Sequence, residues 1–316
     1  MNKTLCIIGG TGFIGSHLTF HLANAGWHIR VPTRRRHRHR ELLVHQRVEL
    51  LEANVHDPEV LKDLFRNVDA VINLAGILNE AGADGFEKVH VELPRKIIAA
   101  MQTTSVRRLL HMSALNADSG EPHSRYLRTK GEGEQLVHQA DAVDATSFRP
   151  SVVFGPGDSF FNRFAALLRL SPLVFPLACA DAKFAPVHVG NVVQAFEYAL
   201  GHDDSIGQGY ELCGPSVYTL RELVSYTARQ IGRRTLIIGL PDFAARLQAT
   251  LLGLLPGKPF TMDNYYSLQK DSVCTHSALA DMDLTPHSIE SVVPTYLAQR
   301  NPRGIYHTYR RAARRQ

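Results

Sequence analysis

Residues 5–15 of the chain read Leu5-Cys6-Ile7-Ile8-Gly9-Gly10-Thr11-Gly12-Phe13-Ile14-Gly15. A short apolar run typical of a buried strand leads into four glycines, and an apolar residue then recurs at every fourth position from Ile14 to Leu22, as on one face of a helix. Glycines let the backbone turn tightly and bring an anion close to the unpaired N–H groups that begin a helix. The stretch therefore predicts a strand, an anion-binding turn and a helix in direct succession.

The same alternation of strand and helix continues over the first half of the chain. Short apolar runs predict strands at Leu5–Ile8, Ile29–Val31, Val48–Leu51, Ala70–Leu74, Arg108–Met112 and Thr146–Val153. Helices are predicted between them, at Ile14–Ala25, Pro58–Phe65, Phe86–Gln102 and Tyr126–Gln139. Such alternation implies parallel pairing with right-handed crossovers, and so predicts a doubly wound α/β sheet of the Rossmann type.

The second half of the chain has a different texture, with Pro-rich and aromatic stretches after Gly155. Helices are predicted at Phe160–Leu170, Gly190–Leu200, Leu220–Ile231 and Phe243–Leu255, with strands at Phe184–Val189 and Gly209–Cys213 that return to the sheet. We expect a nucleotide-binding domain at 1–156, rejoined by 184–213, then a smaller C-terminal α/β lobe at 157–300 that binds substrate, and a basic tail at 301–316.

Composition limits the class of protein. The 316 residues are 44% hydrophobic and 21% charged, and no run reaches the roughly 18 apolar residues of a membrane helix, so a soluble protein is expected. The four cysteines lie far apart without a CxxC pair, which predicts neither a disulfide framework nor a zinc site and fits a reducing cytoplasm. Sixteen histidines occur without HxxxH or HExxH spacing, so no metal is assigned.

The glycine turn predicts a dinucleotide cofactor. Its contacts with the pyrophosphate are assigned to Gly9, Thr11, Gly12, Phe13, Ile14 and Gly15. An NAD(H) site usually carries an acid near the end of the second strand, yet no Asp or Glu occurs between Ser16 and Arg40. Arg34 and Arg35 stand there instead and suit a 2′-phosphate, which favours NADP(H) over NAD(H). The arginine run would also suit a solvated or nucleic-acid-binding segment, but its position favours the phosphate, and no nucleic-acid partner is expected.

Three further residues have the chemistry of carbonyl reduction. Tyr126 and Lys130 lie four residues apart, hence on one helix face, and Ser113 ends the fifth predicted strand at the edge where ligands bind in such sheets. Tyr126 would donate a proton, Lys130 would lower the pKa of the phenol and hold the nicotinamide ribose, and Ser113 would orient the carbonyl.

With these motifs the chain resembles the extended short-chain dehydrogenases/reductases, the NAD-dependent epimerase/dehydratase superfamily. Narrower motifs resemble its atypical branch, which contains the nucleotide-binding accessory subunit of respiratory complex I and bacterial relatives; they are Tyr126–Glu132, Arg149–Phe164, Pro186–Val189 and Tyr210–Pro215. The resemblance implies adenine contacts at Asn54 and Val55. It also implies cofactor contacts at Ala75, Gly76, Lys130, Pro150, Val152 and Val153, and substrate contacts at Asp158, Phe161 and Arg163. An Asn common in the family corresponds to His90.

Two main functions stay open at this point. One is an NADP(H)-dependent oxidoreductase acting on a small or lipid-like carbonyl or alcohol, related to quinones or the respiratory chain by resemblance. The other is a non-catalytic NADPH-binding scaffold in a respiratory or membrane assembly, and nucleotide-sugar epimerisation is a weaker third. An apolar stripe at Phe243, Leu247, Leu251 and Leu255 is expected to pack in the lobe. With the basic tail it would alternatively attach the protein peripherally to the inner face of a membrane.

Overall fold

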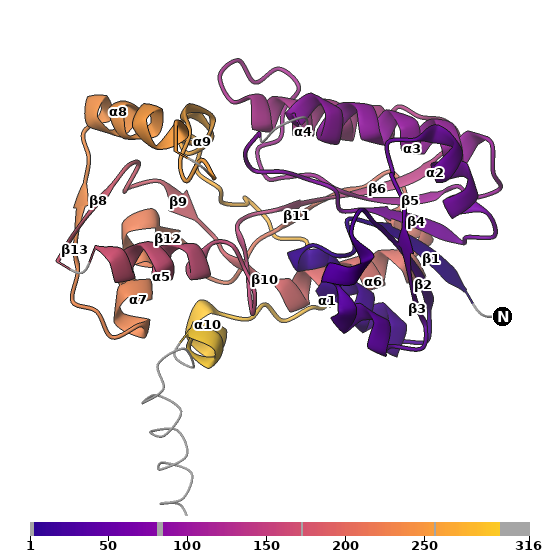
Figure 1. Ribbon diagram of the computed structural model, residues 1–316, viewed down its shortest axis with the longest axis horizontal. Coiled ribbons are helices and arrows are strands. Elements are labelled where there is room, and N and C mark those ends of the chain that lie inside the picture. The colour runs from indigo at the N-terminus through magenta and orange to yellow at the C-terminus, as the bar shows by residue number, and fades with distance from the viewer. Residues whose placement is uncertain (1–2, 81–84, 172, 256, 298–316) are drawn as a thin grey trace, which may run out of the picture. The chain divides into compact units, whose positions relative to one another are not determined.

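The structure is a computed structural model that describes residues 3–80, 85–171, 173–255 and 257–297 (Figure 1). The chain forms two compact units. Unit 1 comprises Met1–Pro150, Val192–Leu212 and His276–Leu284; unit 2 comprises Ser151–Asn191, Cys213–Thr275 and Thr285–Gln316. The predicted basic tail at 301–316 lies outside the described residues.

Unit 1 is built on one seven-stranded sheet. Its strands lie in the order β11-β6-β5-β4-β1-β2-β3, and every neighbouring pair is parallel. Their bounds are β1 Thr4–Ile8, β2 His28–Thr33, β3 Val48–Glu52, β4 Ala70–Asn73, β5 Arg108–Met112, β6 Asp144–Pro150 and β11 Gly209–Leu212. The chain winds from β1 outward to β3 and then from β4 outward to β11, so the predicted doubly wound Rossmann sheet is confirmed.

Helices cover both faces of this sheet. Figure 1 shows α2, α3 and α4 on one face and α1 and α6 on the other. Their bounds are α1 Phe13–Asn24, α2 Pro58–Phe65, α3 Leu93–Gln102, α4 Arg125–His138 and α6 Val189–Gly201, with short turns η1 Arg36–Arg38, η2 Arg40–Val44, η3 Lys88–Glu92 and η4 Asp203–Ser205. The helix predicted over 86–102 thus contains a π-turn, η3, before α3.

The core of unit 1 follows from the sequence pattern. Strand residues of the apolar runs are buried, as at Cys6, Ile8 and Leu109. The amphipathic helix α2 places Leu61 and Phe65 against them. This packing fixes the switch point between β1 and β4, where the chain changes direction and where ligands bind in such sheets.

Unit 2 contains three two-stranded sheets and the remaining helices. The parallel pairs are β7 Val153–Phe154 with β10 Val187–His188, and β8 Val174–Leu177 with β13 Leu236–Gly239; β9 Lys183–Phe184 and β12 Tyr218–Thr219 pair antiparallel. The helices are α5 Phe161–Leu170, α7 Leu220–Gln230, α8 Asp242–Gly253, α9 Met262–Ser267 and α10 Ile289–Leu297. Of the segment 184–213, β11 is in the seven-stranded sheet, whereas β9 and β10 pair within unit 2.

Helix α8 corrects the prediction that its large apolar side chains pack in the lobe. Phe243, Leu247 and Leu251 are 75%, 56% and 56% exposed. The helix is instead buried through Ala245 and Ala249, because only small side chains allow its close approach to Tyr265 and its neighbours. Periodicity located the helix correctly but assigned the wrong face to the interior.

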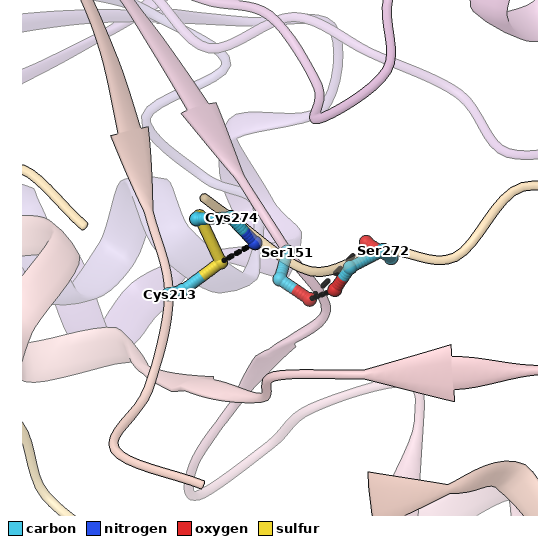
Figure 2. Close-up of a disulfide and its surroundings, with 4 residues drawn as sticks. All are labelled: Ser151, Cys213, Ser272 and Cys274. Atoms are coloured by element: carbon cyan, nitrogen blue, oxygen red, sulfur yellow. Dashed lines mark hydrogen bonds between the residues drawn. A yellow bond between two sulfur atoms is a disulfide. The ribbon is translucent and has the colours of Figure 1, made fainter. Parts of the chain in front are cut away.

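The expectation that the cysteines form no disulfide is also wrong. Cys213 and Cys274 are bonded, although they lie 61 positions apart in the sequence. Figure 2 shows the segment around Cys274 alongside Ser151, whose hydroxyl donates to the Ser272 carbonyl at 2.7 Å. The spacing of the cysteines in the sequence did not predict this bond, because the pairing depends on the tertiary path of the chain. The cysteine-based argument for a reducing cytoplasm therefore loses its premise, and that location stays a prediction.

Across the described ranges no helix combines the length and apolar character needed to cross a bilayer.

Candidate active site

The glycine turn after β1 has the geometry of an anion cradle. Gly9 adopts φ +80°, and a Cβ there would lie 2.9 Å from the Ala75 backbone nitrogen. A Cβ on Gly15 would lie 2.2 Å from the Gly9 carbonyl oxygen, so any side chain would push α1 away from the turn. The turn is therefore held in contact with the segment after β4, at the switch point of the sheet.

The start of α1 suits a pyrophosphate. Gly12 is its N-cap and supplies no side chain, and the first turn carries no acid in the described structure. The N–H groups of a first helical turn have no intrahelical acceptors and attract negative charge. These residues fit the phosphates of a dinucleotide, the group that the sequence predicted here.

A second part of the site lies where β2 and β3 end. A cavity of about 390 Å³ is lined by Arg34, Glu52, Ala53 and Asn54. Glu52 is opposite Thr33 in the parallel register, so a carboxylate reaches the pocket from the neighbouring strand. The residues that follow β2 in the sequence did not indicate this carboxylate, although the strand order of a Rossmann sheet places the end of β3 beside the end of β2. Arg35 follows on the surface, where its N–H donates to Thr33 Oγ1 at 3.4 Å.

The residues assigned to adenine sit on the next turn. Asn54 Oδ1 accepts from the His56 N–H at 3.1 Å, which fixes the turn after β3. Val55 is half-buried and packs against the core of unit 1. Both lie beside the cavity that Arg34 lines, on the same edge of the sheet as the glycine turn.

Ser113 follows the last residue of β5 and is 3% exposed. Its N–H donates to the Phe148 carbonyl at 2.8 Å, which extends the β5–β6 ladder by one step. Within the described residues, its hydroxyl is buried without a hydrogen-bond partner. A buried polar group without a partner is costly, so this hydroxyl is available for a bound molecule.

Lys130 lies in α4, one turn after Tyr126, and is 5% exposed. Its Nζ donates to the Met112 carbonyl at 2.9 Å, next to Ser113. A Cβ on Gly76 would lie 3.1 Å from Nζ, so the ammonium also borders the segment after β4. Burial lowers the pKa of Lys130 to about 8, and Glu134 counters this in part. The helix thus carries a buried cation to the strand edge where Ser113 lies.

The ring of Tyr126 packs among aromatic neighbours. Its centroid is 5.6 Å from His90 and 5.9 Å from Phe86, both in edge-on contacts. The structure therefore positions the phenol from the π-turn η3 as well as from its own helix.

His90 connects the two segments that flank the site. Its Nε2 accepts from the Ile77 N–H at 3.1 Å, and its Nδ1 is 3.0 Å from Thr129 Oγ1. The Thr129 hydroxyl donates to the Arg125 carbonyl at 2.8 Å, so its oxygen accepts from a protonated Nδ1. Burial, together with repulsion from Lys130 and His111, lowers the pKa of His90 to about 2. A neutral imidazole thus fastens the turn after β4 to α4, beside Lys130.

A second buried histidine lies beneath the site. Asn73 ends β4; its Nδ2 is 3.2 Å from His111 Nδ1, and its Oδ1 accepts from the Ala75 N–H at 3.2 Å. Burial lowers the pKa of His111 to about 3, with Lys130 adding repulsion. Neither histidine was predicted to have a role. Polar residues inside buried runs, as at His111 in Arg108–Met112, are the sequence feature that could have indicated them.

Pro150 and the remaining predicted residues lie further along the chain. Pro150 ends β6 in unit 1, and its carbonyl accepts from the Leu115 N–H at 3.1 Å. Val152 and Val153 belong to unit 2, where Val153 pairs with Val187 in β10.

The three residues assigned to substrate also lie in unit 2, each with partners there. Asp158 is 3% exposed and accepts from the Tyr296 hydroxyl at 2.6 Å. Phe161 is fully buried against Phe154. Arg163 donates to the Pro259 carbonyl, and burial lowers its pKa.

Comparisons with known proteins agree with this architecture. Residues 5–213 match the model of the NAD dependent epimerase/dehydratase family. Subunit 9 of the 1 alpha subcomplex of mitochondrial NADH dehydrogenase [ubiquinone] from Rattus norvegicus is 32% identical over 261 residues, covering 81% of this chain and 68% of the relative. A ceramide reductase of Caulobacter vibrioides is 29% identical over 255 residues, covering 75% of this chain and 74% of the relative.

A solved structure with the same fold is the dTDP-glucose 4,6-dehydratase DesIV of Streptomyces venezuelae with NAD and TYD bound. It has a TM-score of 0.74 at 19% identity and covers 93% of this chain and 96% of its own. The family match spans the whole glycine turn, the Ser113 edge and α4. The chain belongs to the NAD dependent epimerase/dehydratase family.

Proposed function

We propose that the protein is an NADP(H)-dependent oxidoreductase that acts on a lipid-like carbonyl or alcohol. The observation that carries the proposal is the arrangement at the end of β5. There the buried hydroxyl of Ser113, which has no hydrogen-bond partner among the described residues, follows Met112, whose carbonyl accepts from the buried ammonium of Lys130. A buried cation beside an open hydrogen-bonding group is typical of a site where charge develops on a substrate oxygen.

The residues of the chain have distinct roles in this proposal. When bound, NADPH would supply the hydride. Tyr126 would donate its phenolic proton to the carbonyl oxygen, and Ser113 would hold that oxygen by a hydrogen bond. Lys130 would favour the phenolate of Tyr126 by its charge and bind the nicotinamide ribose. His90 would keep Lys130 and the turn after β4 in place.

NADP(H) is proposed over NAD(H) because Arg34 lines the cavity at the end of β2. Glu52 in the same cavity opposes this preference. A carboxylate repels a 2′-phosphate, and it accepts a hydrogen bond from the 2′-hydroxyl in many NAD(H) sites. Arg35 adds a second positive charge on the adjacent surface.

A lipid-like substrate is proposed from the relatives. Besides the ceramide reductase, a sterol-4-alpha-carboxylate 3-dehydrogenase of Candida albicans is 23% identical over 221 residues. The domain at 1–156 would bind the cofactor, and the lobe at 157–300 would bind the lipid, with Asp158, Phe161 and Arg163 shaping its site.

The second candidate is a cofactor-binding subunit without turnover. It is favoured by the 32% identity to the mitochondrial NADH dehydrogenase subunit, and by a 40 kDa subunit of the Neurospora crassa NADH-ubiquinone oxidoreductase at 29% identity over 241 residues. In that case the protein would bind NADPH and join a respiratory assembly.

The test is oxidation of NADPH with a panel of long-chain ketones, ceramide-type ketones and ubiquinone analogues. The proposal expects turnover with at least one lipid ketone that disappears in Tyr126→Phe. NADPH binding without turnover across the panel favours the subunit, and tighter binding of NADH would overturn the cofactor assignment.

A further inference from the structure

Large apolar side chains on the molecular surface gather in one part of unit 2. Of the fifteen such exposed residues in the described structure, ten lie within 159–180, 223–241 and 243–262. They are Leu170, Leu173, Val174, Leu236, Ile238, Phe243, Leu247, Leu251, Leu254 and Leu255. Single exposed apolar residues are ordinary, whereas a concentration of this kind marks an interaction surface.

Helix α8 provides one part of this surface. Its alanines face the lobe, while Phe243, Leu247, Leu251 and Leu254 recur at helical spacing on the opposite side. Leu254 is 80% exposed. A helix that turns its small residues inward and its large apolar residues outward is arranged for a partner outside the unit.

The two-stranded sheet of β8 and β13 provides the other part. Leu236 pairs with Val174, and Ile238 pairs with Pro176, so these four exposed side chains share one face. The alternate residues, such as Ile237, point into the core. Helix α8 follows β13 directly, and Gln248 Nε2 donates to the Pro176 carbonyl at 3.1 Å, which joins the helix to this sheet (Figure 1).

Positive charge lies along one edge of this surface. On α8 itself the charge is balanced, because Arg246 forms an ion pair with Asp242 at 2.9 Å. Arg169 precedes β8, and Arg233 and Arg234 precede β13; all three are exposed, and in the described structure none forms an ion pair. The amino ends of parallel strands lie at one edge, and the Leu236 N–H donates to the Leu173 carbonyl at 2.9 Å. The arginines therefore border the exposed face of the sheet.

We propose that this apolar surface of unit 2, formed by α8 and the β8–β13 sheet with its bordering arginines, docks on an anionic lipid bilayer. An amphipathic helix with aromatic and leucine side chains on one face lies in the interface of a bilayer, and neighbouring cations bind lipid phosphates. The arginines along the edge of the sheet favour a negatively charged partner, and lipid phosphates supply that charge. The inference is independent of whether the active site turns over.

The test is co-sedimentation of the full chain with vesicles of phosphatidylglycerol and phosphatidylcholine, or of phosphatidylcholine alone, at low and high salt without cofactor. Wild type is expected to bind the anionic vesicles at least about tenfold more strongly, with much of the binding lost in high salt. Phe243→Ser/Leu247→Ser/Leu251→Ser and Arg233→Glu/Arg234→Glu should each reduce binding at least about tenfold. The exposed residues Leu43 and Val44 of unit 1 supply the matched control, Leu43→Ser/Val44→Ser, which should bind as wild type.

A second readout does not depend on lost binding. Tryptophan emission of Leu247→Trp should shift to shorter wavelength when anionic vesicles are added, whereas Leu43→Trp should not respond. Unchanged sedimentation of the triple-serine variant would overturn the proposal. So would a wild-type dimer that dissociates in that variant while neither protein binds vesicles, because the occupant would then be a second copy.

Discussion

At the scale of single residues, the proposed chemistry depends on Tyr126 and Lys130, one turn apart on α4. We expect Tyr126→Phe to lower kcat about 10²- to 10⁴-fold, the range for loss of a general acid, while the affinity for NADPH stays within about twofold. The ring contacts with His90 and Phe86 survive because phenylalanine keeps the ring. Steady-state turnover and fluorescence titration of NADPH measure the two effects.

Lys130→Met is the contrasting variant, because the ammonium is proposed to act on both the phenol and the cofactor. It should weaken NADPH binding as well as kcat, while its unbranched side chain fills the same buried space. Full activity of Tyr126→Phe with the true substrate would mean that another group donates the proton.

The proposed cofactor preference depends on opposing charges at the ends of β2 and β3. Arg34→Ala/Arg35→Ala should weaken NADPH binding by about 1.5–3 kcal/mol, or one to two decades, and leave NADH nearly unchanged. Glu52→Gln should do the reverse: it removes repulsion, so NADPH binds more tightly and NADH more weakly. Titration of both cofactors into each variant measures the preference. A Glu52→Gln variant that loses affinity for NADPH would contradict the 2′-phosphate assignment.

At the scale of elements, the Cys213–Cys274 disulfide links the residue that follows β11 to a distant segment of the chain. Closing a loop of this length restricts the unfolded chain, so Cys213→Ser should lower the free energy of unfolding by roughly 2–4 kcal/mol. Thermal unfolding with and without dithiothreitol measures the same effect in wild type. Cys179→Ser is the control, since Cys179 is a free thiol. Equal stability of oxidised and reduced wild type would show that the bond does not constrain the fold.

The positions of the helices and strands were largely predictable from the sequence, whereas their tertiary contacts were not. Strands such as β1 and helices such as α1 follow from local period and from the glycine turn, which are properties of neighbouring residues. The outward face of α8 depends on how closely Ala245 approaches the lobe, and the bond from Cys213 depends on a chain path far from it. Such features are set by tertiary packing, and a pattern of neighbouring residues does not predict them.

The candidate site divides in the same way. Gly9, Ser113 and Lys130 could be predicted because motif and strand order place them at one edge of the sheet. Glu52 was missed, and His90 and Asn73 were given no role, because each reaches the site from a different element, through contacts that only the assembled sheet creates. The roles of residues that surround a motif could therefore be recognised only in the folded structure.

At the scale of the whole molecule, two buried histidines link the integrity of unit 1 to pH. The pKa of His90 is lowered to about 2 and that of His111 to about 3, from 6.5 in an exposed ring, because burial disfavours the charged form. Above pH 6.5 both rings are neutral in the folded and unfolded chains, and stability is complete. Below it the unfolded chain takes up protons that the folded chain cannot, so stability falls as pH falls.

The expected loss is roughly 1.4 kcal/mol per pH unit for each histidine between pH 6.5 and about 3. Lys130 does not contribute there, since its pKa of about 8 leaves it charged in both states. Urea unfolding followed by the single tryptophan, Trp27 in unit 1, measures the slope between pH 7 and pH 5. His90→Asn should be less stable at pH 7, because it loses a ring contact, yet show a smaller pH dependence, with the remainder due to His111 and to His138, whose pKa burial also lowers. His37→Asn, at an exposed position, should keep the wild-type slope, and a wild-type slope close to zero would mean that one or both rings are protonated in the folded protein.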